Sequence, residues 1–158
     1  MKTFFIYLIL ASIFLIIKTT ILHILLPSVL IPDVILIMVF YLGFRRNSIE
    51  GVITVFALGY LSDVFSGGII GVSSFTLVFI FVATSIFAKA LILNNVVTKI
   101  GGVFVMSILK GILTYIALKF LNEKIPFYII LPTAVSTGII SLFIIFLLER
   151  VETSLIKR

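Results

Sequence analysis

Four charged side chains lie inside or at the ends of long apolar runs, and these residues are the ones in the sequence best able to do chemistry. Lys18 and Lys110 are basic, and Asp33 and Asp63 are acidic. In a membrane, a charge at the bilayer centre costs about 2.5 to 3.5 kcal/mol, so such groups face one another, other helices or water. We therefore expect Asp63 to pair with Lys110 or Lys18. The alternative is that both lysines extend to the nearest headgroups.

Catalytic and metal-binding patterns are absent from the sequence. It contains no H-E-x-x-H, no G-x-S-x-G with a histidine base and no G-x-x-x-x-G-K-[ST]. There is no cysteine, and the single histidine, His23, has no set of three or four ligands around it. The four charges could line a path for protons or a solute, but no acid is spaced with a second titratable group for general acid–base catalysis. We predict a protein that is not an enzyme, with no metal or cofactor.

The elements that position these charges are apolar helices. Hydrophobic residues make up 62% of the 158 positions and charged residues 11%, against roughly 25% charged in an ordinary soluble domain. A membrane-spanning helix needs roughly 20 mostly apolar residues, so six of them use about 120. The sequence predicts an all-α membrane protein with one six-helix transmembrane domain over residues 1–158. The helices are expected near residues 3–26, 28–44, 50–66, 69–88, 99–121 and 125–148.

Two local features modify these segments. Only 13 residues separate Pro32 from Phe44, so the second segment needs Ser28 to Ile31 as well, and Pro27 and Pro32 predict a kink or unwound turn there. Gly59 and Asp63 are four residues apart and share a helix face. This face could make a close contact with another helix that a polar interaction of Asp63 holds in place.

Glycines are also concentrated after the third segment. Gly67 and Gly71 have the G-x-x-x-G spacing of close helix contacts. The alternative is a glycine-rich turn, which we favour for Gly67 and Gly68.

Lysine and arginine counts predict the orientation, because positive residues are retained on the cytoplasmic side. With the amino terminus inside, the cytoplasmic set is Lys2, Arg45, Arg46, Lys89, Lys99, Arg150, Lys157 and Arg158. Only Lys119 and Lys124 lie on the opposite face. Both termini are then cytoplasmic. The net charge of +6 is explained by this topology and by anionic lipid, without nucleic acid.

Part of the sequence resembles the rod shape-determining protein MreD family. The resemblance lies between residues 32 and 71, under a third of the chain. It is carried by Pro32-Asp33-Val34-Ile35-Leu36, Tyr41-Leu42-Gly43-Phe44-Arg45-Arg46, Glu50-Gly51, Gly59-Tyr60-Leu61-Ser62-Asp63, and Ser66-Gly67-Gly68 with Gly71. The matching positions, as structural or partner-interface candidates, are Asp33, Tyr41, Arg45, Arg46, Gly59, Asp63, Gly67 and Gly71.

The resemblance implies a scaffold of the cell-elongation machinery in the bacterial inner membrane. Its implied partners are a bitopic MreC-like protein and, with it, MreB, RodA and a penicillin-binding protein in lateral peptidoglycan synthesis. MreD-like proteins also resemble in fold the S components of energy-coupling-factor vitamin transporters, which makes an S component the alternative. S components typically carry an Ala-x-x-x-Ala contact motif in the first helix, whereas here Ala11 stands between Tyr7 and Leu15 at that spacing.

Overall fold

Helices form the regular structure of the described chain. The computed structural model describes residues 2–17, 31–45, 49–67, 69–88, 96–121 and 127–151. The α-helices are α1 (Lys2–Ile17), α3 (Val34–Arg45), α4 (Ile49–Ser66), α5 (Val72–Phe87), α6 (Val96–Phe120) and α7 (Ile130–Val151), with a 3-10 helix η3 (Phe127–Ile129) before α7. The predicted all-α class is confirmed for these residues.

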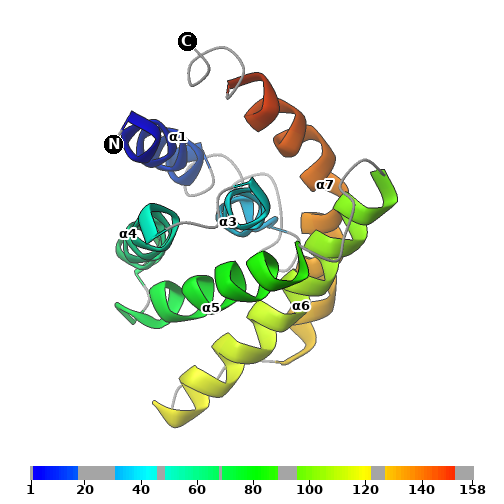
Figure 1. The fold of residues 1–158 in the computed structure, drawn as a ribbon. Coiled ribbons are helices and arrows are strands. Elements are labelled where there is room, and N and C mark those ends of the chain that lie inside the picture. Colours follow the sequence, from blue (N-terminus) through cyan, green and yellow to red (C-terminus); the bar gives the residue numbers. More distant parts are fainter. Residues whose placement is uncertain are drawn as a thin grey trace.

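Helix α3 is the centre of the molecule. Every residue from Val34 to Gly43 is buried, which is the packing expected for a helix that is apolar on all sides. It contacts α1, α4, α5, α6 and α7, and Figure 1 shows it between α1, α4, α5 and α7. Its 12 residues span only about 18 Å, so both ends of α3 lie close to the surrounding helices.

The start of α3 differs from the expected span. Residues 28–44 were expected to be helical, but Ile31, Pro32 and Asp33 have no regular structure and α3 begins at Val34. Proline disfavours helical geometry in the residue before it, and Asp33 takes the capping position. The expected break at Pro27 and residues 28–30 lie outside the described residues.

Two helix hairpins pack on this centre. Helices α4 and α5 follow one another across a short turn, and α6 and α7 pair along their length. Helix α6 runs antiparallel to α7, because Lys99 near its start contacts Glu149 near the end of α7. Figure 1 looks nearly along α1, α3 and α4, whereas α5, α6 and α7 lie across the view, so the two sets of helices cross steeply.

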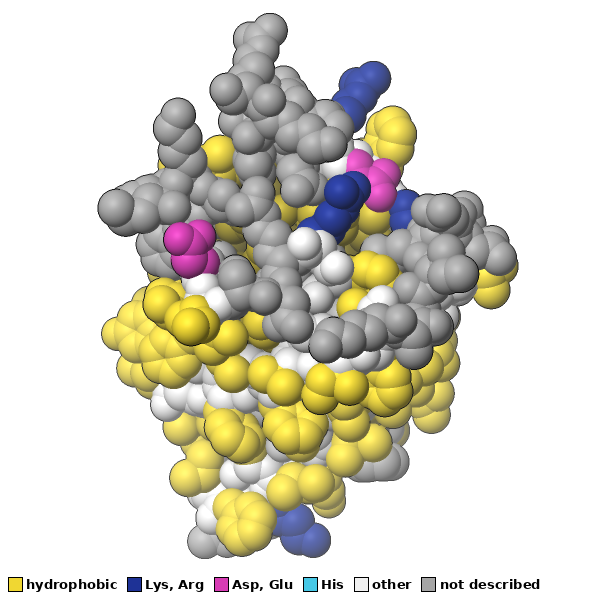
Figure 2. Space-filling model, viewed as in Figure 1, with side chains coloured by type: hydrophobic (Ala, Val, Ile, Leu, Met, Phe, Trp, Pro, Cys, Tyr) yellow, Lys and Arg dark blue, Asp and Glu magenta, His cyan; other side chains and the backbone are white. Residues whose placement is uncertain are grey.

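The exterior is apolar over most of its height. In the described chain, Ile49–Ser66, Val97–Phe120 and Ile130–Val151 are long and apolar enough to cross a membrane, and three shorter helices are also apolar. Figure 2 shows charged side chains near the end where α6 begins and α7 ends, and basic atoms where α6 ends, with mainly hydrophobic surface between them. These helices are those of a membrane protein.

Candidate functional site

A largely buried ion pair joins the start of α3 to α6. Asp33 precedes α3, and its Oδ1 accepts a hydrogen bond from the Leu36 backbone N–H at 3.2 Å. Its Oδ2 pairs with the ammonium group of Lys110 on α6. The two side chains are 16% and 13% exposed. Asp33 therefore caps one helix and holds a lysine of another.

Helix α7 completes this cluster through two threonines. The Asp33 backbone N–H donates to Thr137 Oγ1 at 3.0 Å. The Thr137 hydroxyl in turn donates to the Thr133 carbonyl oxygen at 2.6 Å. Thr137 is fully buried. Three helices far apart in sequence thus meet at Asp33, and hydrogen bonds from all three hold its backbone N–H and its carboxylate.

A pocket of ≈ 210 Å³ opens beside the ion pair. We call it the Lys110 pocket. Its apolar lining includes Ile129 and Ile130 at the junction of η3 and α7. Its polar lining consists of Asp33, Ser107, Lys110, Thr114, Tyr115 and Thr133. The pocket therefore gathers six polar side chains although most of its surface is apolar.

The expected pairing of Asp63 with Lys110 is wrong, because Lys110 pairs with Asp33. Asp63 instead binds the start of α5. Its Oδ2 accepts from the Gly71 N–H at 2.7 Å, and both oxygens lie 3.2 Å from the Ser73 N–H. Gly71 has φ 104, a conformation that favours glycine. The other expected partner, Lys18, lies outside the described residues.

Gly59 lies where α4 and α5 approach most closely. A Cβ added at Gly59 would lie 2.4 Å from the Ser74 Cα and 2.7 Å from its backbone N. The Ser74 hydroxyl donates to the Phe56 carbonyl oxygen at 3.2 Å. Gly59 and Asp63 thus serve the same contact, one by its small size and the other by its charge.

Gly67, with φ 64, lies in the turn that follows α4 rather than in a helix contact. The turn reading favoured for this glycine agrees with that position. Gly68 lies outside the described residues.

The remaining predicted positions lie at the far end of α3. Tyr41 is buried, and the Arg45 guanidinium lies 5.7 Å from the centre of its ring. This distance is within the range of cation–π attraction. Arg46 lies outside the described residues. The structure therefore does not bring Tyr41 and Arg45 to the Asp33–Lys110 pair.

A second charged contact lies at the same end. Lys99 of α6 and Glu149 of α7 form an ion pair at 2.9 Å. The next residue, Arg150, lies over the Phe146 ring at 5.7 Å. Phe44 of α3 and Val97 of α6 line one pocket there, so the end of α3 and the start of α6 are neighbours.

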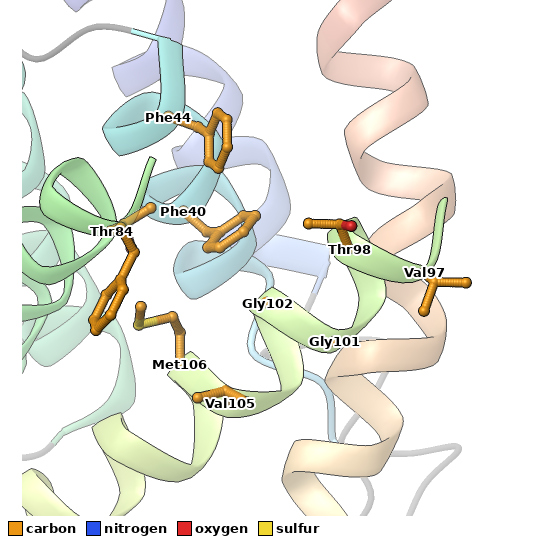
Figure 3. Close-up of a pocket in the computed structure, with 10 residues that line it drawn as sticks. Phe40, Phe44, Thr84, Val97, Thr98, Gly101, Gly102, Val105 and Met106 are labelled. Carbon is orange, nitrogen blue, oxygen red and sulfur yellow. The ribbon is translucent and has the colours of Figure 1, made fainter. Parts of the chain in front are cut away.

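That pocket is apolar and has a volume of ≈ 340 Å³. Figure 3 shows Phe40 and Phe44 of α3 opposite Gly101, Gly102 and Val105 of α6. The Thr84 hydroxyl is buried without a hydrogen-bond partner in the described chain. Nothing in this lining provides a titratable or metal-binding group.

Sequence reasoning missed the hydroxyl residues of the cluster. Thr133 and Thr137 are four residues apart on α7, and Ser107, Lys110 and Thr114 are three and four apart on α6. Each set therefore shares a helix face, a signal that was present in the sequence. No group of three or more histidine, cysteine, aspartate or glutamate residues that could hold a metal occurs within the described ranges.

Comparisons with known proteins assign no family. No family model, no curated protein and no solved structure matches the chain.

Proposed function

We propose that this chain is a multi-pass scaffold of the bacterial cytoplasmic membrane that supports cell elongation, as its MreD-like segment implies. The observation that carries the proposal is the part these residues play in the fold. Asp33, Gly59 and Asp63 all hold helices against one another. Residues that hold the helices together suit a scaffold, which acts by presenting a folded surface to partners.

The carboxylates of Asp33 and Asp63 are both bound within the fold, which supports a non-catalytic role. Both carboxylate oxygens of Asp63 receive backbone N–H groups. The Asp33 carboxylate holds Lys110 and the start of α3. General acid–base catalysis needs a group able to reach the proton of a substrate, whereas these two carboxylates are engaged in holding the fold.

The partner we propose is the single membrane helix of an MreC-like bitopic protein. Helix α6 offers apolar side chains to the outside, with Val97 73% and Val105 59% exposed. In lipid, such a surface binds a helix by close packing rather than by the hydrophobic effect. The basic end around Lys99 and Arg150 would face the cytoplasm, close to an MreB filament and to anionic lipid. RodA and a penicillin-binding protein would join the same complex.

Depletion of the chain in a rod-shaped host tests this proposal. We expect cells to widen and round, and an MreC-like protein to copurify with the chain from detergent extracts. Wild type and Gly138→Ala should restore the rod shape, because Gly138 is buried away from the proposed partner surface and a Cβ there would make only ordinary contacts, the nearest at 3.6 Å. Gly59→Ala should restore it poorly. Depleted cells that keep their width and shape would contradict the proposal.

The alternative is the S component of a vitamin transporter, and the observation in its favour is the Lys110 pocket with its cluster of polar side chains. The first helix speaks against it. Ala11 is fully buried, with Tyr7 and Leu15 buried beside it, so the stripe at the position of the S-component contact motif packs inside the chain. A vitamin that copurifies with the protein, or an adjacent ATPase gene, would favour this alternative.

A further inference from the structure

We infer that the Lys110 pocket binds an oxyanion, and that its source is the phosphate of a membrane phospholipid. The inference depends on the pocket and the charges around it, and it does not rest on the proposed role in cell elongation. The pocket combines hydrogen-bond donors, a cationic side chain and a size suited to a headgroup, at a depth that a headgroup can reach.

The first argument is the surplus of donors. An ammonium group has three N–H donors, and the only hydrogen bond of Lys110 to the described residues is the one to Asp33. The hydroxyls of Ser107 and Thr114 line the same pocket and make no hydrogen bond within the described ranges. Donors left without acceptors in an apolar region are costly. A ligand rich in acceptor oxygens would satisfy them.

The second argument is electrostatic. The Asp33 carboxylate offsets the charge of Lys110, and it is itself held by the Leu36 N–H at the start of α3. Thr133, in the first turn of α7, also lines the pocket. The start of a helix carries a partial positive charge. The ion pair therefore carries no net charge, and the helix start favours a single negative charge, such as that of a phosphodiester, over a cation.

The third argument is size and position. The volume of ≈ 210 Å³ is below the roughly 300 to 1,000 Å³ of pockets that enclose drug-sized ligands, and it suits a headgroup better than a whole lipid. Thr114 and Lys110 lie six and ten residues before Phe120, the last residue of α6, which is about 9 and 15 Å of helix. The start of α7 lies at the same level, because Ile130 lies beside Gly111. A phosphate at the membrane surface could reach the pocket while its acyl chains stay in the bilayer.

Native mass spectrometry of the detergent-purified full chain tests the inference. The probes are phosphatidylglycerol and a diacylglycerol with the same acyl chains but no phosphate. We expect phosphatidylglycerol to bind at least tenfold more tightly. Sodium phosphate added in competition identifies the source of the oxyanion. If phosphate binds and phospholipid does not, the pocket is an oxyanion site whose ligand is soluble phosphate and not a lipid.

Variants locate the site. The double variant Asp33→Asn with Lys110→Met removes both charges together and should weaken phosphatidylglycerol binding at least tenfold. Ser107→Ala with Thr114→Val keeps the ion pair, and should weaken binding about fivefold even if the first variant does not fold. Lys119→Met, on the exposed end of the same helix, is the matched control and should change binding less than twofold.

Two results would overturn the inference. One is equal binding of phosphatidylglycerol and diacylglycerol with no binding of sodium phosphate. The other is wild-type affinity for phosphatidylglycerol in the Ser107→Ala, Thr114→Val variant, when circular dichroism shows that its helix content is unchanged.

Discussion

Two aspartates each close the start of a helix, and in both cases the carboxylate also joins that helix to another element. Asp33 caps α3 and holds Lys110 of α6, while Asp63 of α4 receives the first N–H groups of α5. A carboxylate at this position complements the partial positive charge of the helix start. In an apolar surrounding it also replaces the water that would otherwise satisfy those N–H groups.

Replacement of Asp63 by alanine should destabilise the fold. The change leaves the Gly71 and Ser73 N–H groups without their acceptor, which costs about 2 kcal/mol for hydrogen bonds to a charged group. Asp63→Asn should cost about half as much, because one acceptor oxygen remains. Unfolding by sodium dodecyl sulfate in mixed micelles, followed by circular dichroism, measures both. A change below about 0.5 kcal/mol for Asp63→Ala would show that the cap contributes little.

A double-mutant cycle on Asp33 and Lys110 should show strong coupling. Lys110→Met alone leaves a buried carboxylate without its partner, which costs about 3 to 5 kcal/mol. Adding Asp33→Asn should recover much of that loss, because the cap is kept and the uncompensated charge is gone. The same unfolding measurement applies. The cycle of Lys110→Met with Asp63→Asn should be additive, and coupling there instead would support the pairing that the sequence alone suggested.

At the scale of elements, the contact between α4 and α5 depends on one position without a side chain. The Gly59 Cα faces the Ser74 backbone, and a Cβ would overlap atoms that cannot rotate away. The Ser74 hydroxyl and the Asp63 carboxylate then fix the two helices in register. Small residues and satisfied polar groups are the means by which helices associate in lipid.

Gly59→Ala should therefore cost about 2 to 3 kcal/mol, because α5 has to move away from α4. Gly101→Ala is the matched control on α6, where nothing lies within 4 Å of the added Cβ. Alanine there should be neutral or stabilising by up to about 1 kcal/mol, because it favours the helix over glycine. Thermal unfolding in detergent compares the two. Equal effects at both positions would contradict the close approach at Gly59.

Hydropathy predicted the helices well because each apolar run is long enough to define one. The start and end of α4 lie within one residue of the predicted 50–66. The start of α3 differs more, because capping by Asp33 rather than apolar length determines its first residue. An aspartate directly before an apolar run is a known start signal, and Asp33 could have placed this boundary from the sequence.

The candidate site was less predictable because it depends on how the helices pack. Asp33 and Lys110 are 77 residues apart, and helix periodicity gives the face of a residue without giving its neighbour. The charges in apolar segments were identifiable as important, but the sequence offered two basic candidates for Asp63, Lys110 and Lys18, and no particular partner for Asp33. The antiparallel arrangement of α3 and α6 determines which residues pair, because it brings Asp33 to Lys110 and Phe44 to Val97.

At the scale of the whole molecule, the charges are separated along α6 and α7. Lys99, Glu149 and Arg150 lie together at one end, and Lys119 lies near the other end of α6. The predicted orientation places the first group in the cytoplasm and Lys119 outside. Apolar side chains cover the surface between these ends (Figure 2).

Cysteine accessibility tests this arrangement most directly, because the natural chain contains no cysteine. Val97→Cys and Phe120→Cys are exposed positions at the two ends of α6, 73% and 86% accessible. In intact cells, a thiol reagent that does not cross the membrane should label position 120 and should label position 97 only after the membrane is made permeable. Labelling of both positions before permeabilisation, or of position 97 alone, would contradict a helix that crosses the membrane with its basic start inside.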